Sequence, residues 1–230
     1  MNVVAIVQSR MGSSRLPGKA LKPLAGRPML QHVLERALHI RGVNHVVLAT
    51  SLNERDTPLV DLAADVVGIP VYRGNEHDVL GRFAFVAEEM RADYVIRLTG
   101  DCPFLAPDVC EAVLTVATTE TRWEYISNDT TCSGYPDGFD CEVFPLFSLQ
   151  RAHAFATSHL DREHVTPWMM RHLLRRTVTA PEPLEREKLS VDCEQDLIRA
   201  RRIFGYLENG DFSSRGTLAA LAMMKKEEEA

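Results

Sequence analysis

The feature that most limits the possible folds is a continuous apolar run, Val3 to Val7, near the start of the chain. Such β-branched runs without polar alternation are typical of strands buried on both faces of a parallel sheet. Strand and helix patterns then alternate to about residue 125. Further strands are expected at 45–49, 71–72 and 94–98, and helices at 29–38, 57–67, 79–90 and 107–118. This alternation predicts an α/β fold with a mostly parallel twisted sheet flanked by helices.

The rhythm changes from about residue 123 to residue 180. Two strand patterns, 125–127 and 141–144, flank a loop rich in Gly, Pro and Asp, and two helices are expected to follow. We interpret this region as an insertion that covers the site within a single domain, 1–230. A strand at 189–191 and a helix at about 194–206 should complete the fold, and the charged tail 225–230 is expected to fray.

Composition and charge exclude several classes of protein. With 45% hydrophobic and 25% charged residues, the chain has the composition of an ordinary soluble globular protein. The net charge of -6 argues against a general nucleic-acid binder, which must neutralise phosphates. Five cations nevertheless precede the first acid, Glu35, and this local excess favours a small anionic ligand. They are Arg10, Arg15, Lys19, Lys22 and Arg27.

Neither a secreted nor a membrane protein is expected. The apolar start lacks the charged lead and long apolar stretch of a secretory signal, and no apolar segment is long enough to span a bilayer. The 5 cysteines form no C-x-x-C pair, so we expect reduced thiols in a cytoplasmic protein and disfavour a zinc site.

The loop after the first strand, Gln8 to Lys19, combines glycines, hydroxyls and cations. A triphosphate needs close approach by backbone N–H groups, which Gly12 permits, and fixed positive charge from Arg or Lys. The spacing from Gly12 to Lys19 is one residue too long for a P-loop, and the loop contains no G-x-G-x-x-G. A solvated basic loop is the alternative, but its place directly after a parallel strand favours phosphate binding.

This loop resembles the N-terminal motif of the cytidylyltransferases that activate sugar acids, such as the acylneuraminate and KDO enzymes, and is most similar to the spore-coat polysaccharide SpsF-like branch. Four further segments match the family in order and extend the resemblance over most of the chain. They are Arg97-Leu98-Thr99-Gly100-Asp101-Cys102-Pro103, Gly138-Phe139-Asp140-Cys141-Glu142-Val143-Phe144, Arg162-Glu163-His164-Val165-Thr166-Pro167 and Leu189-Ser190-Val191-Asp192.

The resemblance implies a GT-A-like nucleotidyltransferase fold, CTP as donor, and a lid or dimerisation role for the insertion. It implies that the basic loop surrounds the triphosphate and that the loop after the second strand lies near the nucleoside. The nucleotide-binding residues would be Arg10, Gly12, Ser13, Ser14, Arg15, Lys19, Thr50 and Ser51. Of these, Lys19 and Arg10 would stabilise phosphate charge and act in catalysis together with Asp101.

Two aspartates, Asp101 and Asp192, each follow an expected strand, and ligands of open α/β sheets bind beyond the carboxyl ends of strands. By resemblance they hold Mg²⁺ (or Mn²⁺), which takes one or two carboxylates together with phosphates and waters. The alternative is that each aspartate caps the next helix.

Residues of three segments are candidates for the acceptor. Arg73 and Arg82 are expected to pair with an acceptor carboxylate or phosphate, and nothing between them decides which. Asp140 and Glu142 share one face of a strand and are expected to bind acceptor hydroxyls or to assist deprotonation. The remaining candidates are Asp78, Arg162 and His164. The alternatives are a surface loop, exposed strand polarity and a packed histidine.

Together these observations favour an enzyme of surface polysaccharide or glycoconjugate biosynthesis. It would transfer CMP from CTP to a sugar-acid-like or related anionic acceptor and release pyrophosphate. A homodimer without nucleic-acid or membrane partners is expected. A GT-A glycosyltransferase is a weaker alternative because no two aspartates form a D-x-D pair. A catalytically silent nucleotide-binding subunit is a third.

Overall fold

The computed structural model describes residues 1–181, 187–208 and 210–229. Within these ranges the centre of the fold is a seven-stranded sheet with the order β5-β4-β1-β6-β8-β7-β9. Every strand except β8 runs in the same direction, which confirms the mostly parallel sheet. In chain order the strands are β1 (Val3–Gln8), β4 (His45–Ser51), β5 (Val71–Gly74), β6 (Tyr94–Thr99), β7 (Tyr125–Ser127), β8 (Glu142–Pro145) and β9 (Arg175–Thr177).

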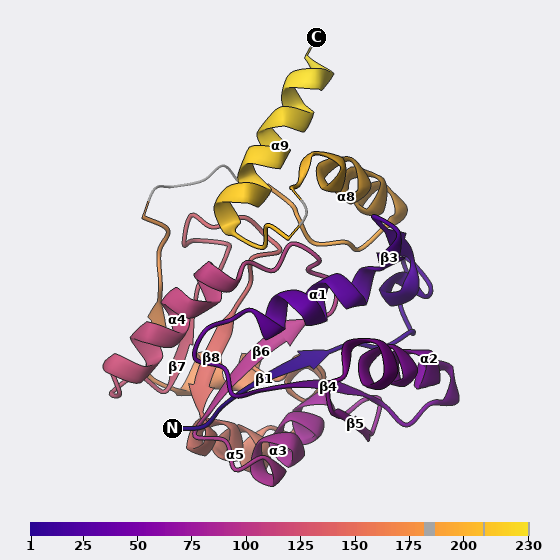
Figure 1. Ribbon diagram of the computed structural model, residues 1–230. Coiled ribbons are helices and arrows are strands. Elements are labelled where there is room, and N and C mark those ends of the chain that lie inside the picture. Colours follow the sequence, from indigo (N-terminus) through magenta and orange to yellow (C-terminus); the bar gives the residue numbers. More distant parts are fainter. Residues whose placement is uncertain (182–186, 209, 230) are drawn as a thin grey trace.

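Helices cover both faces of the sheet (Figure 1). Side chains of β1 alternate between two apolar clusters, so both of its faces are buried. Val3, Ala5 and Val7 face α1 (Met29–Leu38) and α4 (Pro107–Thr119). The residues between them, Val4 and Ile6, face α3 (Val79–Glu89) and α5 (Leu146–Phe155). Burial on both faces is the reason that the strand reads as a continuous apolar run.

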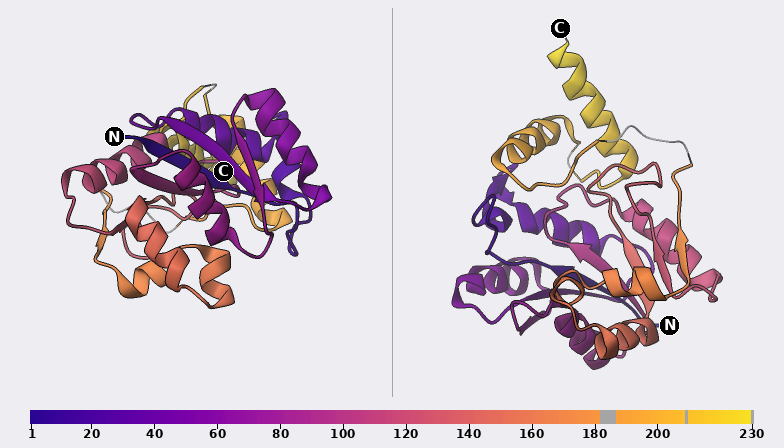
Figure 2. Two further views of the ribbon diagram at one scale, coloured as in Figure 1. Left: turned by 90° about the horizontal axis from the view of Figure 1, so that it is seen from below. Right: turned by 180° about the vertical axis from the view of Figure 1, so that it is seen from behind.

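A third apolar cluster lies beyond this sandwich. It joins α8 (Glu194–Tyr206) and α9 (Ser214–Glu228) to the loops around Phe104 and Phe139. Arg36 ties the same part to α1, because its buried guanidinium donates to the carbonyls of Leu105 and Phe212. The far end of α9 extends away from the body (Figures 1 and 2).

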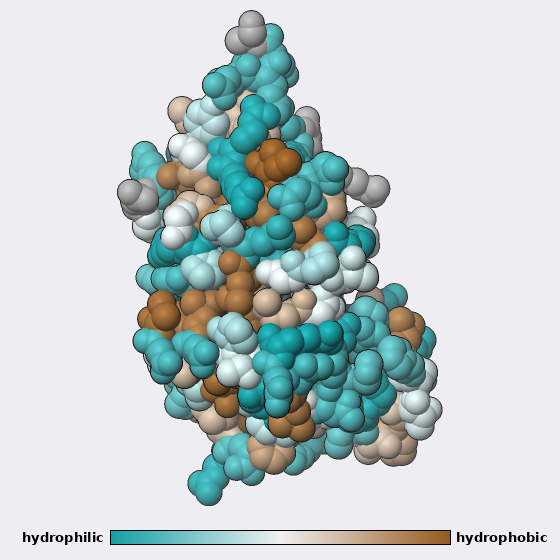
Figure 3. Space-filling view, turned by 90° about the vertical axis from the view of Figure 1, so that its right-hand side faces the viewer, coloured by the Kyte–Doolittle hydropathy of each residue, from teal (hydrophilic) through white to brown (hydrophobic). Residues whose placement is uncertain are grey.

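Short elements complete the described chain. They are η1 (Lys19–Leu21), β2 (Pro23–Leu24), β3 (Arg27–Pro28), η2 (Glu54–Asp56), α2 (Thr57–Asp61), η3 (Leu62–Val67), α6 (His159–His164) and α7 (Pro167–His172). No helix in the described ranges is long and apolar enough to cross a membrane. The face that carries α2, β3 and α8 is mostly hydrophilic, with hydrophobic side chains confined to smaller groups (Figure 3).

Three expectations about the elements were wrong. Residues 189–191 form no strand, because their amides bind two loops beyond the sheet: Leu189 N–H donates to Asp137 O and Val191 N–H to Asp101 O. The tail does not fray from residue 225, since α9 continues to Glu228. Three helices, α5, α6 and α7, replace the two that were expected in the insertion, because Ser158 starts a new helix by capping Asp161 N–H.

The topology places one edge of the sheet at the site. The carboxyl ends of β1 and β6 lie at this edge, and so does the amino end of the antiparallel strand β8. The basic loop, Asp101 and the segment before Glu142 therefore leave the sheet at the same edge.

Candidate active site

The basic loop after β1 folds back on itself. The carbonyl of Met11 accepts hydrogen bonds from Ser13 N–H and Gly18 N–H, at 2.9 and 3.2 Å. Gly18 has φ 67° and caps the short helix η1, a left-handed conformation that favours glycine. The next residue, Lys19, is directed inward by this turn and keeps 15% of its side-chain surface exposed.

A buried carboxylate, Asp56, anchors this loop. Its Oδ1 accepts the Met11 N–H at 2.8 Å, while Oδ2 accepts the hydroxyls of Ser51 at 2.5 Å and Thr50 at 3.3 Å. Thr50 and Ser51 are fully buried and line neither of the cavities described below. Their hydroxyls therefore hold the loop through Asp56, a different place from the nucleoside contact that was expected of them.

Lys19 contacts both predicted metal-binding aspartates. One of them, Asp101, follows β6, and the other, Asp192, follows Val191. The Lys19 ammonium lies 3.0 Å from Asp101 Oδ2 and 3.2 Å from Asp192 Oδ1, and donates to Val191 O at 2.8 Å. Arg15 reaches the same Asp192 oxygen at 3.0 Å. The basic loop and both carboxylates thus converge at one point of the sheet edge.

Two backbone features hold Asp192 at that point. Val191 N–H donates to Asp101 O at 2.8 Å, which docks the incoming segment beside the β6 loop. The helix-capping role considered for Asp192 belongs to a capping box of Cys193 and Asp196, in which the Asp196 carboxylate accepts the N–H groups of Asp192 and Cys193. The Asp192 carboxylate is therefore directed to cations and not to the start of α8.

Burial and Lys19 act in opposite directions on Asp101. Burial would raise the pKa of Asp101, but the Lys19 ammonium and a hydrogen bond from Thr99 outweigh it, and the pKa lies below the usual value. Asp101 is therefore ionised at neutral pH and able to bind a cation.

Asp101 and Asp192 fit a small divalent cation by donor type and position. Their oxygens contact the same ammonium, so one ion can reach both. Among the described residues, no three His, Cys, Asp or Glu side chains are grouped to hold a metal. An ion bound here would take only two carboxylates and would need phosphate or water oxygens for the rest, as Mg²⁺ commonly does.

The first cavity, of about 360 Å³, lies over the basic loop. Arg10 enters it and pairs with Glu163 at 2.8 Å and Glu76 at 3.6 Å. The buried Arg82 lines the same cavity, where burial and then the charge of Arg10 lower its pKa. The predicted residues that line this cavity are Arg10, Gly12, Ser13, Ser14, Arg15, Lys19, Arg82, Asp101, His164 and Asp192.

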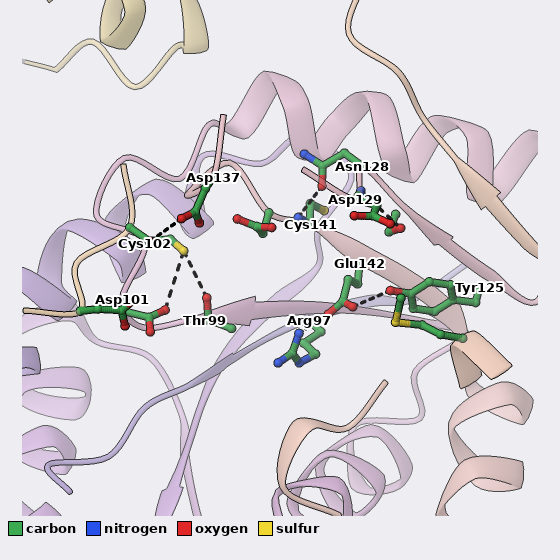
Figure 4. Close-up of a pocket in the computed structure, with 15 residues that line it drawn as sticks. Arg97, Thr99, Asp101, Cys102, Tyr125, Asn128, Asp129, Asp137, Cys141 and Glu142 are labelled. Carbon is green, nitrogen blue, oxygen red and sulfur yellow. Dashed lines mark hydrogen bonds and ion pairs between the residues drawn. The ribbon is translucent and has the colours of Figure 1, made fainter. Parts of the chain in front are cut away.

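A second cavity, of about 340 Å³, adjoins the first and shares Arg97, Thr99, Asp101 and Asp192 with it. It lies between β6, β8 and the loops after β7 and before β8 (Figure 4). Asp140 and Glu142 both line it, but β8 begins at Glu142, so Asp140 lies in the loop before the strand and not on the strand that was expected to carry both. Burial, together with the charges of Asp137 and Glu142, raises the pKa of Asp140.

Glu142 is the centre of a hydrogen-bonded group in the wall of the second cavity. It pairs with Arg97, and its Oε1 accepts from Tyr125 at 2.5 Å and Thr166 at 2.8 Å. Burial and the neighbouring Glu142 raise the pKa of Tyr125 well above its ordinary value, so the phenol remains a donor. In Figure 4 the side chains of Arg97, Glu142 and Tyr125 are directed toward one another.

The other predicted acceptor residues lie elsewhere. Arg73 donates to the carbonyls of Ser51 and Asn53, and Asp78 forms a two-bond ion pair with Arg162 at 2.6 and 2.8 Å. None of Arg73, Asp78 and Arg162 lines either cavity. Arg82 and His164 lie on the side of the basic loop and not in the second cavity.

Several site residues received no role from the sequence. Arg97 interrupts an otherwise apolar strand, and this lone charge is the signal that could have identified it. Asp129 and Asp137 belong to a loop rich in polar residues that offers no comparable signal. Glu163 belongs to a matched family segment, but only the fold, which places α6 beside Arg10, shows that it pairs with that residue.

Comparison with known proteins adds to this geometry. Residues 4–206 match the family model described as cytidylyltransferase. The spore coat polysaccharide biosynthesis protein SpsF of Bacillus subtilis (strain 168) is 31% identical over 207 residues, which cover 85% of this chain and 83% of that protein.

Solved structures share the fold. A cytidylyltransferase from Leptospira borgpetersenii serovar Hardjo-bovis (strain JB197) superposes with a TM-score of 0.91 at 25% identity, over 100% of this chain and 96% of that one. CMP:2-keto-3-deoxy-manno-octonic acid synthetase, solved in complex with CTP, gives a TM-score of 0.67 at 23% identity, over 89% and 99% of the two chains.

Proposed function

This chain belongs to the cytidylyltransferase family, whose members are nucleotidyltransferase enzymes, and we propose that it transfers CMP from CTP to a hydroxyl group of a sugar-type acceptor with release of pyrophosphate. The observation that carries the proposal is the contact of Lys19 with both Asp101 and Asp192. It brings phosphate-binding and metal-binding groups together at the edge of the sheet where ligands of such folds bind.

The triphosphate is assigned to the first cavity. Lys19, Arg15 and Arg10 would supply fixed positive charge, and Ser13, Ser14 and the Gly12 backbone would supply hydrogen-bond donors. Arg10 would exchange its bonds to Glu163 and Glu76 for phosphate oxygens. Arg82 adds a fourth cation to this wall, so we reassign it from the acceptor to the nucleotide.

Asp101 and Asp192 would hold Mg²⁺ or Mn²⁺ together with phosphate oxygens. When bound, the ion neutralises charge on the α-phosphate and on the departing pyrophosphate. The protein's own contribution is to fix both carboxylates through Val191 and Lys19, and to keep Asp101 ionised.

The acceptor is assigned to the second cavity, which shares Asp101 and Asp192 with the first. An acceptor hydroxyl would attack the α-phosphorus, forming an O–P bond while the bond to the β-phosphate oxygen breaks and pyrophosphate leaves with its electron pair. Asp140 is proposed to take the hydroxyl proton, because a carboxylate with a raised pKa is a better base than an ordinary one.

The anionic character expected of the acceptor is not carried into the proposal. That expectation rested on the resemblance to enzymes that activate sugar acids and on Arg73 and Arg82. Arg73 lines neither cavity, and Arg82 lies on the triphosphate side. The relative named for spore coat polysaccharide biosynthesis supports a sugar-type acceptor in surface polysaccharide biosynthesis. A cytoplasmic location is part of the proposal because the reaction consumes CTP.

We also propose a homodimer through the insertion. Large apolar side chains are exposed on it, among them Phe147, Phe155 and Leu174. A dimer mass by light scattering supports this assembly, and a monomer at every concentration measured contradicts it.

The function is tested by a pyrophosphate-release screen that crosses the four ribonucleoside triphosphates with a panel of sugars and sugar derivatives. The proposal predicts pyrophosphate release that requires CTP and an acceptor together. A glycosyltransferase of similar fold would consume a nucleotide sugar and release no pyrophosphate from CTP. Binding of CTP without turnover of any acceptor would support a silent subunit instead.

A further inference from the structure

The charge of the second cavity bears on the chemical class of the acceptor. This inference rests on the proposed function, which seats the acceptor there because the cavity shares Asp101 and Asp192 with the triphosphate site. The cavity, of about 340 Å³, is large enough for one sugar-sized molecule. The acceptor group that lies away from CTP must therefore be compatible in charge with the wall of the second cavity that lies opposite the triphosphate site.

Carboxylates dominate the lining. Three of the acids are compensated by cations. Asp101 pairs with Lys19, Glu142 pairs with Arg97, and Asp192 pairs with Lys19, Arg15 and Lys188. The other three, Asp129, Asp137 and Asp140, form no ion pair with a cation of the described residues. Arg97 is the one described cation that lines this cavity, and its charge is already matched by Glu142.

The hydrogen-bond partners of the three uncompensated acids are neutral. Asp137 accepts from Ser190 at 2.9 Å and Asp129 from Thr131 at 2.5 Å. Asp140 accepts from Thr130 at 2.8 Å and from Gly138 N–H at 2.7 Å. Neutral donors orient the carboxylates but leave their negative charge in place.

These carboxylates line a wall and do not surround an ion. No three acidic, His or Cys side chains among the described residues are grouped to hold a metal. Figure 4 shows Asp101, Asp129, Asp137 and Glu142 spread around the cavity. A metal bound at Asp101 and Asp192 would leave the far wall negative.

The backbone fixes this wall in place. Asp137 pairs with Lys188 in an isolated β-bridge. Gly138, at φ +104°, packs so closely that an added Cβ would lie 2.7 Å from Ser190 N. The two segments can meet only with glycine there, so this packing fixes the segment that carries Asp137 and Asp140 although the two like charges repel. The raised pKa of Asp140 reflects burial and the charges of Asp137 and Glu142.

We propose that the acceptor is an amine-bearing sugar or polyol, whose protonated amino group is held in the negative cavity that Asp129, Asp137 and Asp140 line, while a hydroxyl reaches the α-phosphate of CTP. An ammonium group matches three uncompensated carboxylates, whereas a carboxylate or phosphate on the acceptor would meet like charge. This class differs from the acidic sugars expected from family resemblance.

The test uses matched sets of sugars that differ at one position by a hydroxyl, an amine or a carboxylate. Pyrophosphate release from CTP and Mg²⁺ should be fastest with the amine, with kcat/KM at least about tenfold above that of the acid. Equal or faster reaction of the neutral or acidic member overturns the inference and leaves the proposed function intact.

Binding separates failure of the inference from failure of the function. Calorimetry with the protein, Mg²⁺ and a non-hydrolysable CTP analogue reports acceptor affinity without turnover. If the amines bind more tightly than the neutral and acidic sugars but no sugar of any set gives pyrophosphate, the proposed function is contradicted and the inference about the acceptor is not. Tighter binding of acids contradicts the inference.

Asp137→Asn and Asp129→Asn test the residues, and Asp61→Asn, an exposed aspartate of α2, is the matched control. The first two should raise KM for the amine about tenfold with little change for the neutral sugar, whereas the control should alter neither. An equal loss for all three members would indicate a structural role and overturn the assignment.

Discussion

The ammonium of Lys19 lies 3.0 Å from a carboxylate oxygen of Asp101, although 82 positions separate the two residues. The same nitrogen lies 3.2 Å from Asp192, 173 positions away. Three distant segments therefore meet around one charge. The fold achieves this because β1 and β6 are adjacent parallel strands and Val191 binds the loop after β6.

Removal of the Lys19 charge should lower turnover with little effect on folding. Lys19→Met retains the aliphatic part of the side chain, so kcat for pyrophosphate release should fall about 10²- to 10³-fold while the far-UV spectrum is unchanged. Lys226→Met, at an exposed position on α9, is the control and should retain normal kcat. Near-normal turnover of the Lys19 variant would remove this residue from the site.

Metal dependence should map onto two residues. Chelation should abolish activity, and added Mg²⁺ or Mn²⁺ should restore it. Asp101→Asn and Asp192→Asn each replace a charged ligand with a neutral one, so the metal concentration for half-maximal activity should rise at least about tenfold. Asp108→Asn, outside both cavities, should leave it unchanged. An unchanged metal requirement in both site variants would contradict the assignment.

The proposed role of Asp140 as the base should make the enzyme activity depend on pH. As the proposed base Asp140 acts only when ionised, and burial with nearby acids raises its pKa above the ordinary value. Activity should therefore fall as pH drops through this raised pKa, and the loss should begin at a higher pH than for an exposed aspartate. In Asp140→Asn, kcat should be about 10²-fold lower and this acidic limb should be absent. The same limb in the variant would assign it to another group.

Asp56 should affect CTP through the loop it anchors. The fully buried Asp56 carboxylate accepts hydrogen bonds from Met11 N–H and from the Ser51 hydroxyl, and Asp56→Asn should weaken both. This loss should lower the free energy of unfolding by about 1 to 3 kcal/mol. The loosened loop should raise KM for CTP more than KM for the acceptor. Urea unfolding and steady-state kinetics measure the two effects. A variant that changes stability alone would show that the loop does not depend on this anchor.

The ion pair between Asp78 and Arg162 should stabilise the insertion at neutral pH. Asn caps helices as well as Asp, so Asp78→Asn isolates the charge and should cost about 0.5 to 1 kcal/mol at neutral pH. Burial would raise the pKa of Asp78, but Arg162 lowers it below the ordinary value. This contribution is present above the unfolded-state pKa of about 4 and is lost as pH falls through the lower folded-state value. Unfolding of variant and wild type at neutral and acidic pH measures it, and a difference that persists in acid would contradict the ion-pair origin.

Much of the sheet follows from local patterns. The run at Val3 and the β–α alternation gave the parallel strands, because burial on both faces leaves a continuous apolar stretch. The segment 189–191 carries a similar apolar pattern but pairs with loops, since its neighbours across the fold are Asp137 and Asp101. The pattern of apolar residues shows that a segment is buried. It does not show which groups accept hydrogen bonds from the backbone amides of that segment.

The site divides in the same way. Lys19, Asp101 and Asp192 could be named from their positions after apolar segments and from family motifs. Arg73 and Arg162 carry the charge expected of anion-binding residues, but their guanidinium groups bind protein carbonyls and Asp78. Which cations remain available for a ligand depends on contacts between distant segments, so the acidic wall at Asp137 was not predictable from charge counts.

The most direct test is a crystal structure with CTP and Mn²⁺, with the metal located by its anomalous signal. A manganese peak is expected within bonding distance of Asp101 and Asp192, with the triphosphate contacting Lys19 and Arg15. A peak away from these carboxylates, or a triphosphate that does not touch the basic loop, would contradict the proposed site.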